Sequence, residues 1–124
     1  MQYKEKTMGK AHENWMRACR IADVAADSGV CIEADGKQLA VFNFSALGTW
    51  YAVDNRCPHW NEQVLARGLL GDLGGEPKVA CPMHKRCYSL ETGAYLNGAG
   101  YIATYPVCIE DGYAYVNTTP NNAT

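Results

Sequence analysis

The sequence predicts an all-β domain. Short segments rich in β-branched and aromatic residues recur along the chain, and turn-forming pairs such as Asp35-Gly36 and Asp111-Gly112 separate them. No amphipathic helical pattern is longer than about two turns, and only residues 61–66 fit a short helical turn. The 124 residues allow one compact domain.

The first half of the chain predicts four strands joined by short connections. These strands are expected at 15–20, 30–33, 39–44 and 49–53. Asp35-Gly36 is expected to close a two-residue hairpin, because both central positions of a type I′ turn require positive φ. Leu47-Gly48 provides the next turn, before a strand whose residues suit a pleated, half-buried surface.

Residues 55–100 interrupt this pattern. They contain Pro58, Pro77, Pro82 and most of the glycines, a composition typical of loops and tight turns. We expect a small inserted subdomain here, with short strands at 68–73 and 78–80 and with residues 88–90 leading into a turn at 91–93. The chain then returns to the first sheet with strands at 103–109 and 113–116.

Composition excludes several classes of protein. The net charge is −2 and no basic cluster is present, so nucleic acid is not an expected partner. No apolar run approaches the ~18–20 residues that span a bilayer, and the N-terminal segment is polar, which predicts a cytoplasmic protein with no membrane partner. In that compartment the six cysteines are expected to stay reduced. Residues 1–13 are interpreted as a flexible tail and 118–124 as a frayed C-terminus.

Two motifs carry the candidate chemistry, Cys57-Pro58-His59 and Cys81-Pro82-Met83-His84. Two cysteines and two histidines suit either a tetrahedral zinc or a [2Fe–2S] cluster of the Rieske type. In an extended C-x-H segment the two side chains diverge, so they suit different metal ions. Structural zinc sites usually pair like ligands locally, whereas the order here is interleaved. The spacing favours the cluster, with a structural zinc module as the alternative.

The same residues resemble the Rieske signature C-x-H…C-x-x-H. Residues 64–70 and 84–93 further resemble the small subunit of the assimilatory NAD(P)H nitrite reductase, and the likeness covers about residues 15–116. The resemblance implies a Rieske-type antiparallel β-sandwich at 14–117, with a cluster-binding subdomain at about 55–100. It also implies a [2Fe–2S] cluster held by four residues: Cys57, His59, Cys81 and His84.

The resemblance implies an electron-transfer subunit with no catalytic residue of its own. Its expected partner is the large catalytic subunit, which carries flavin, an iron–sulfur cluster and sirohaem and reduces nitrite to ammonium in nitrate assimilation. The first alternative is a Rieske ferredoxin that feeds an aromatic-ring dioxygenase. In such ferredoxins Gly usually follows the second histidine, where this chain has Lys85.

Several neighbours of the motifs have two interpretations. High-potential Rieske proteins have Ser where this chain has Arg86 and an extra disulfide for which Cys87 lacks a partner, so a low potential is expected. Tyr88 occupies the family's aromatic position, and it either donates to a ligand sulfur or only packs on the cluster. Lys85 and Arg86 form either a docking patch or a solvated pair. Cys19 and Cys31 are expected in adjacent strands as buried apolar side chains rather than as a redox pair.

Overall fold

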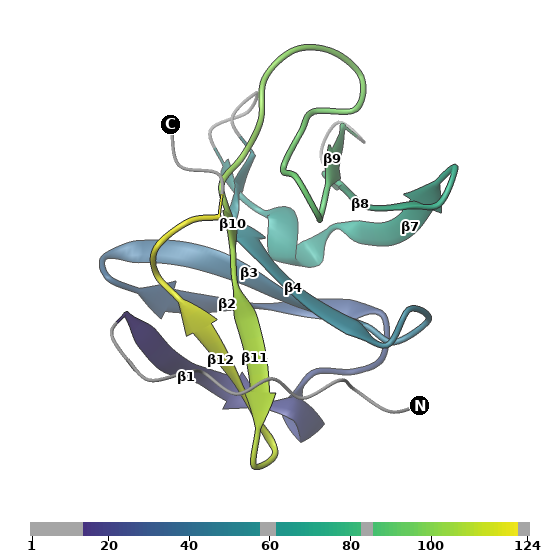
Figure 1. Ribbon diagram of the computed structural model, residues 1–124. Coiled ribbons are helices and arrows are strands. Elements are labelled where there is room, and N and C mark those ends of the chain that lie inside the picture. The colour runs from purple at the N-terminus through teal and green to yellow at the C-terminus, as the bar shows by residue number, and fades with distance from the viewer. Residues whose placement is uncertain (1–13, 58–61, 83–85, 122–124) are drawn as a thin grey trace.

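The computed structural model describes residues 14–57, 62–82 and 86–121, with no side-chain description for Glu62 and Leu73. It consists of antiparallel sheets and two short 3₁₀ turns, which confirms the all-β prediction. Among the described residues, no helix has the length and apolar character needed to cross a bilayer. In Figure 1 two crossing sheets form the lower part of the molecule, and strands β7, β8 and β9 lie above them.

The base of the molecule is a β-sandwich. One sheet has the order β1-β12-β11, and the other has the order β10-β4-β3-β2. The strands of the first sheet are β1 (Trp15–Arg20), β11 (Val107–Glu110) and β12 (Tyr113–Asn117). Those of the second are β2 (Ser28–Ala34), β3 (Lys37–Phe44), β4 (Thr49–Asp54) and β10 (Thr104–Tyr105).

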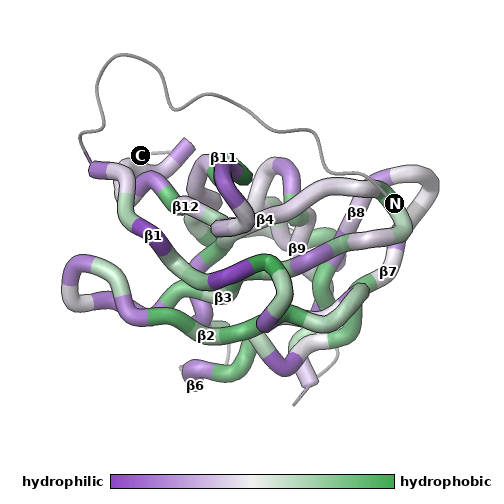
Figure 2. Tube along the Cα trace, turned by 90° about the horizontal axis from the view of Figure 1, so that it is seen from below, coloured by the Kyte–Doolittle hydropathy of each residue, from purple (hydrophilic) through white to green (hydrophobic). Residues whose placement is uncertain are grey.

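Strand β3 is buried on both faces from residue 39 onwards, which explains why residues 39–42 are apolar without alternation. Leu39 and Val41 pack into the core between the two base sheets. Ala40, Phe42 and Phe44 point the other way. They pack against the upper subdomain, the described part of the chain from residue 56 to residue 102, which lies above the sandwich in Figure 1. Figure 2 shows the neighbouring β2 as hydrophobic in its middle section. One strand therefore joins the two cores of the molecule.

The predicted turns are present with the backbone conformations that their residues allow. Asp35 and Gly36 have φ of 54° and 80°, and Asp111 and Gly112 have φ of 53° and 81°. Both pairs adopt the left-handed region that a type I′ hairpin requires. The hairpin at Asp35-Gly36 sets the β2–β3 register, in which Ala34 lies opposite Lys37. Gly is favoured at the second turn position because it has no Cβ to clash there.

The predicted strand 103–109 is not continuous. It is divided into β10 and β11 at Pro106. Proline has no amide proton and so cannot donate a hydrogen bond to a neighbouring strand. β10 pairs with β4, whereas β11 pairs with β12 in the other sheet. The break at Pro106 therefore allows one segment of chain to belong to both sheets of the sandwich.

The upper subdomain contains two small sheets. One pairs β5 (Arg56–Cys57) with β6 (Glu62–Gln63), and the other has the order β7-β8-β9. The latter comprises β7 (Leu69–Leu73), β8 (Glu76–Ala80) and β9 (Cys87–Ser89). The helical turn expected at 61–66 lies later in the chain, as the 3₁₀ turn η2 (Leu65–Arg67), because residues 62–63 pair as a strand. A second 3₁₀ turn, η1 (Ile21–Asp23), follows β1.

The C-terminal segment differs from the expectation. The amide of Thr118 donates to the carbonyl of Asn14 at 2.8 Å, and the amide of Asn121 donates to the carbonyl of Thr104 at 2.8 Å. Residues 118–121 are therefore attached to the sandwich, and the expected fraying does not begin at 118. The expected tail at 1–13 and the last residues, 122–124, lie outside the described part of the chain.

Candidate metal centre

Cys57 and Cys81 lie in the same hydrophobic core, and both are 0% exposed. Cys57 ends β5, and Cys81 directly follows β8, so a strand fixes the point from which each motif begins. The core that holds them also contains the upward-facing side chains of β3. The structure therefore places in one core two thiols that are 24 positions apart in the sequence.

Tyr88 joins the two cysteines in this core. It lies on β9 and is 0% exposed, and its Oη is 3.8 Å from the Sγ of Cys57. Its ring packs on that of Tyr95, with centroids 5.5 Å apart. Burial raises the pKa of the Tyr88 phenol above its usual value, and the hydrogen bond with Cys57 raises it further. The phenol therefore keeps its proton and is available as a donor to a thiolate.

Both histidines of the motifs, His59 and His84, lie outside the described residues, as do Trp60 and Lys85. Within the described ranges no group of three or more potential metal-ligating side chains occurs. The donor set can thus be assessed from the two cysteines and their surroundings. Buried thiols with a hydroxyl donor suit a metal bound as thiolate, because the thiolate charge needs a metal ion and hydrogen bonds to compensate for burial.

The other four cysteines lie at separate places in the fold. The expectation that Cys19 and Cys31 occupy adjacent strands is wrong, because β1 pairs with β12 and β2 pairs with β3, in different sheets. Cys31 is exposed rather than buried, and Cys19 is half-buried. Desolvation is the main cause that raises the pKa of each thiol, with added contributions from Asp23 at Cys19 and from Glu33 at Cys31.

Cys87 and Cys108 also differ in their surroundings. Cys87 begins β9 and its Sγ lies 3.4 Å from the Nζ of Lys78, whereas Cys108 is buried in the sandwich.

Asn55 is a residue of this region that sequence reasoning did not identify. It is 2% exposed, lies two residues before Cys57, and makes hydrogen bonds to both the base and the upper subdomain. The sequence feature that could have identified Asn55 is a polar residue directly beside the end of a buried strand, two positions before the first motif cysteine.

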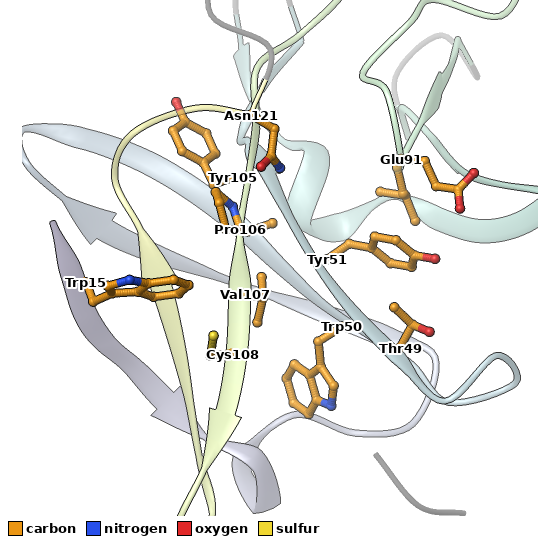
Figure 3. Close-up of a pocket in the computed structure, with 12 residues that line it drawn as sticks. Trp15, Thr49, Trp50, Tyr51, Glu91, Tyr105, Pro106, Val107, Cys108 and Asn121 are labelled. Atoms are coloured by element: carbon orange, nitrogen blue, oxygen red, sulfur yellow. The ribbon is translucent and has the colours of Figure 1, made fainter. Parts of the chain in front are cut away.

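A pocket of about 480 Å³ lies elsewhere, between β4 and β11. Figure 3 shows Trp50 and Tyr51 on β4 and, across from them, Val107 and Cys108 on β11. Neither Cys57 nor Cys81 lines it. This pocket forms where β10 continues into β11 and the chain changes sheets, so it is separate from the candidate metal centre.

The chain belongs to the Rieske-like [2Fe–2S] domain family, whose model matches residues 14–117. This assignment favours an iron–sulfur cluster over the zinc alternative, and the buried thiols of Cys57 and Cys81 with the hydroxyl of Tyr88 fit such a group. A nitrite reductase (NADH) small subunit from Salmonella typhimurium is 30% identical over 99 residues, which cover 79% of this chain and 92% of that protein.

A solved structure described as an NADH-dependent nitrite reductase small subunit from Mycobacterium tuberculosis superposes with a TM-score of 0.78. It is 29% identical, and the match covers 89% of this chain and 96% of that one. The large subunit of a Klebsiella oxytoca nitrite reductase [NAD(P)H] is 34% identical over 82% of this chain, but the chain spans only 11% of that protein. The ferredoxin subunit of a 3-phenylpropionate/cinnamic acid dioxygenase from Shigella flexneri is 32% identical over 84% of this chain and 93% of that protein.

Proposed function

We propose that this chain is the electron-transfer small subunit of an NAD(P)H-dependent nitrite reductase, which reduces nitrite to ammonium. The observation that carries the proposal is the pair of fully buried thiols, Cys57 and Cys81, at the strand ends of a Rieske-like domain. Similarity to nitrite reductase small subunits over most of both chains supports this branch of the family.

The proposed cluster ligands are Cys57 and Cys81 on one iron and His59 and His84 on the other. A bound [2Fe–2S] cluster supplies a one-electron carrier, and its two neutral imidazoles raise the potential above that of an all-cysteine cluster. Tyr88 donates its phenolic proton toward the Sγ of Cys57 and thereby stabilises the thiolate charge. We assign the Rieske domain to 14–117 and the cluster-binding subdomain to about 55–100.

The proposed partner is the large catalytic subunit, with flavin, an iron–sulfur cluster and sirohaem. In the Klebsiella protein the matching segment is part of the large-subunit chain itself, which supports a close association between this domain and the catalytic unit. We further propose that the complex serves nitrate assimilation in the cytoplasm. The isolated chain carries electrons and reduces no substrate.

The test begins with the chain purified with its native iron. We expect about two irons per chain, the visible spectrum of a Rieske cluster and an EPR signal after reduction. Cys57→Ser should lose these features, whereas Cys108→Ser, a buried cysteine in the sandwich, should retain them. A colourless protein that binds one zinc would contradict the proposal.

The second part identifies the partner. The reduced chain is mixed with a nitrite reductase large subunit from the same organism, and in parallel with an aromatic-ring dioxygenase oxygenase. Oxidation by the nitrite reductase alone, together with NAD(P)H-dependent ammonium formation that requires the chain, is the expected result. Oxidation by the oxygenase alone would support the Rieske ferredoxin alternative, to which the Shigella relative belongs.

A further inference from the structure

We propose that Asn55 is the positioning residue of the first ligand loop, defined as residues 57–63. The inference rests on the proposed ligand set, in which this loop provides Cys57 and His59. Asn55 lies between β4 and β5 and is 2% exposed. It closes the loop at its base and attaches it to strand β3, so that Cys57 stays within reach of Tyr88.

The first part of this role is loop closure. The carbonyl oxygen of Asn55 accepts hydrogen bonds from the amides of Val64 and Leu65, each at 2.9 Å. The side-chain Oδ1 of Asn55 accepts a third bond from the amide of Ala66 at 2.7 Å. Three consecutive amides that follow the loop are thus bound by one residue that precedes it, and the two ends of the loop cannot separate without breaking these bonds.

The second part is attachment to the base. The amide of Asn55 donates to the carbonyl of Gln38 at 3.1 Å. Its side-chain Nδ2 donates to the Oε1 of Gln38 at 3.2 Å and to the Sγ of Cys31 at 3.4 Å. The side chain therefore accepts from η2, which follows the loop, and donates to strands β2 and β3 at the same time. Asn combines an acceptor and two donors in this short planar shape, whereas Ser, Asp and Ala do not.

The packing of the loop's return segment supports the same role. Leu65 of η2 is fully buried in the core that contains Cys57 and Cys81. A Cβ at Gly29 would lie 3.0 Å from the carbonyl oxygen of Ala66, so the absence of a side chain there allows this segment to approach β2 closely. Asn55 thus binds the return segment at the place where it contacts the base.

The second ligand loop, defined as residues 81–86, is closed differently. The amide of Cys81 donates to the carbonyl of Arg86 at 2.7 Å, which is a bond between two backbone groups. No substitution of a side chain removes that bond directly. At Asn55 the bond from Ala66 is made to the side chain, so truncation of Asn55 removes it together with the attachment to Gln38, while the backbone bonds from Val64 and Leu65 remain. Truncation of Asn55 should therefore loosen the first loop without breaking the backbone bond that closes the second.

The experiment compares Asn55→Ala with Asn43→Ala in the cluster-loaded chain. Asn43 is a matched control, because it is 4% exposed and its Nδ2 donates to the carbonyl of Val24 at 3.1 Å, within the base. Three quantities are measured: the first-order loss of visible absorbance to an iron chelator, the EPR spectrum of the reduced cluster, and hydrogen exchange at the amides of Leu65 and Ala66. Chemical denaturation gives the global stability of each variant.

We expect Asn55→Ala to lose its cluster about tenfold faster than the parent, because a buried hydrogen-bonded side chain is removed from the loop base. Its EPR lines should broaden or shift, and exchange at Ala66 should accelerate by about the same factor. Asn43→Ala should keep the parental EPR spectrum and rate of cluster loss even where its global stability falls equally.

The inference is overturned if Asn55→Ala and Asn43→Ala of similar global stability lose the cluster at the same rate with unchanged EPR spectra. If Asn55→Ala does not fold, Asn55→Asp replaces it, since it keeps the acceptor for Ala66 and lacks the donors to Gln38. Parental cluster loss in Asn55→Asp would then overturn the attachment role, and faster loss would support it. A parent without a [2Fe–2S] spectrum contradicts the proposed function instead, and hydrogen exchange at Ala66 still tests loop closure.

Discussion

The hydroxyl of Tyr88 lies 3.8 Å from the Sγ of Cys57, and both residues are fully buried. Tyr88 lies on β9, which follows the second motif in the chain, and Cys57 ends β5 and begins the first motif. The contact therefore connects the two motif regions. From the sequence, Tyr88 has two possible roles, a donor to a ligand sulfur or a packing residue. The geometry favours the donor role, in addition to the ring contact with Tyr95.

Replacement of Tyr88 by Phe should lower the reduction potential of the cluster. The ring remains, but the donor that stabilises charge on the Cys57 thiolate is lost, and added charge is more costly on the reduced cluster. We expect a decrease of about 60 mV, the one-electron equivalent of a tenfold change in equilibrium. Redox titration followed by EPR measures it. Tyr95→Phe, which keeps the ring packing, is the control, and an unchanged potential in Tyr88→Phe would leave Tyr88 with a packing role only.

Gly68 should not tolerate a side chain. A Cβ there would lie 2.5 Å from the carbonyl oxygen of Ala80 and 2.6 Å from a methyl carbon of Val79, directly before Cys81. Since φ at Gly68 is −71°, lack of space rather than backbone strain is the cause. We expect Gly68→Ala to lower the free energy of unfolding by about 1–3 kcal/mol.

Gly71, on the strand β7 that begins directly after Gly68, is the control for this prediction. A Cβ at Gly71 would meet only the flexible end of Lys78 at 3.5 Å, so Gly71→Ala should be close to the parent. Urea unfolding of both variants measures the difference. Equal midpoints for Gly68→Ala and Gly71→Ala would show that β8 can move away from η2 without cost, contrary to the packing described above.

The fold was largely predictable because its strands and hairpins are encoded locally. Asp-Gly pairs define the two type I′ turns, and residues 39–42 of β3 are apolar because this part of the strand is buried on both faces. The break at Pro106 was not predicted, although Pro in a strand was the available signal. Which sheet each strand joins depends on distant pairings, and for that reason Cys19 and Cys31 were wrongly expected to be neighbours.

The candidate centre was predictable only in part. Residue type and spacing identified the two motifs, and the structure brings Cys57 and Cys81 into one core. The importance of Asn55 could not be derived from spacing, because its partners Gln38 and Ala66 lie on separate segments that meet only in the folded chain. Hydrogen bonds between distant segments leave no periodic signal in a sequence.

Tyr105 should make stability decrease at high pH. Its hydroxyl donates to Asp54 at 2.7 Å, and burial, followed by this bond and the charge of Asp54, raises the pKa of the phenol. The folded protein therefore retains a proton that the unfolded chain loses above its pKa of about 10. The stability provided by Tyr105 is complete below about pH 10 and decreases as the pH rises towards the folded-state pKa.

We expect Tyr105→Phe to be less stable at neutral pH by about 1–3 kcal/mol, because Asp54 loses a donor. Above about pH 10 its stability should fall less steeply than that of the parent. Urea unfolding across a pH series measures both effects. Tyr101→Phe, at a side chain that is 46% exposed, should follow the parental profile. Parallel curves for Tyr105→Phe and the parent would contradict the assignment of this titration to Tyr105.

Arg86 should influence association with the partner. It lies in the second ligand loop, three residues before the end of β9, and its side chain is half-buried, whereas the neighbouring Lys85 lies outside the described residues. A positive charge beside the proposed cluster favours approach of an acidic surface. Such steering acts mainly on the association rate and is screened over about 8–10 Å at physiological salt.

Charge reversal in Arg86→Glu should therefore slow bimolecular electron transfer to the large subunit several-fold at low ionic strength, and the difference should vanish at high salt. Stopped-flow oxidation of the reduced chain over a salt series measures this rate, and the visible spectrum verifies an intact cluster. Arg17→Glu is the matched control: it gives the same change in net charge, but Arg17 lies on β1, where its guanidinium stacks 4.6 Å from the ring centroid of Tyr113. Equal slowing in both variants would mean that net charge alone governs the rate. Unchanged rates in Arg86→Glu at every salt concentration would place the docking surface away from the second ligand loop.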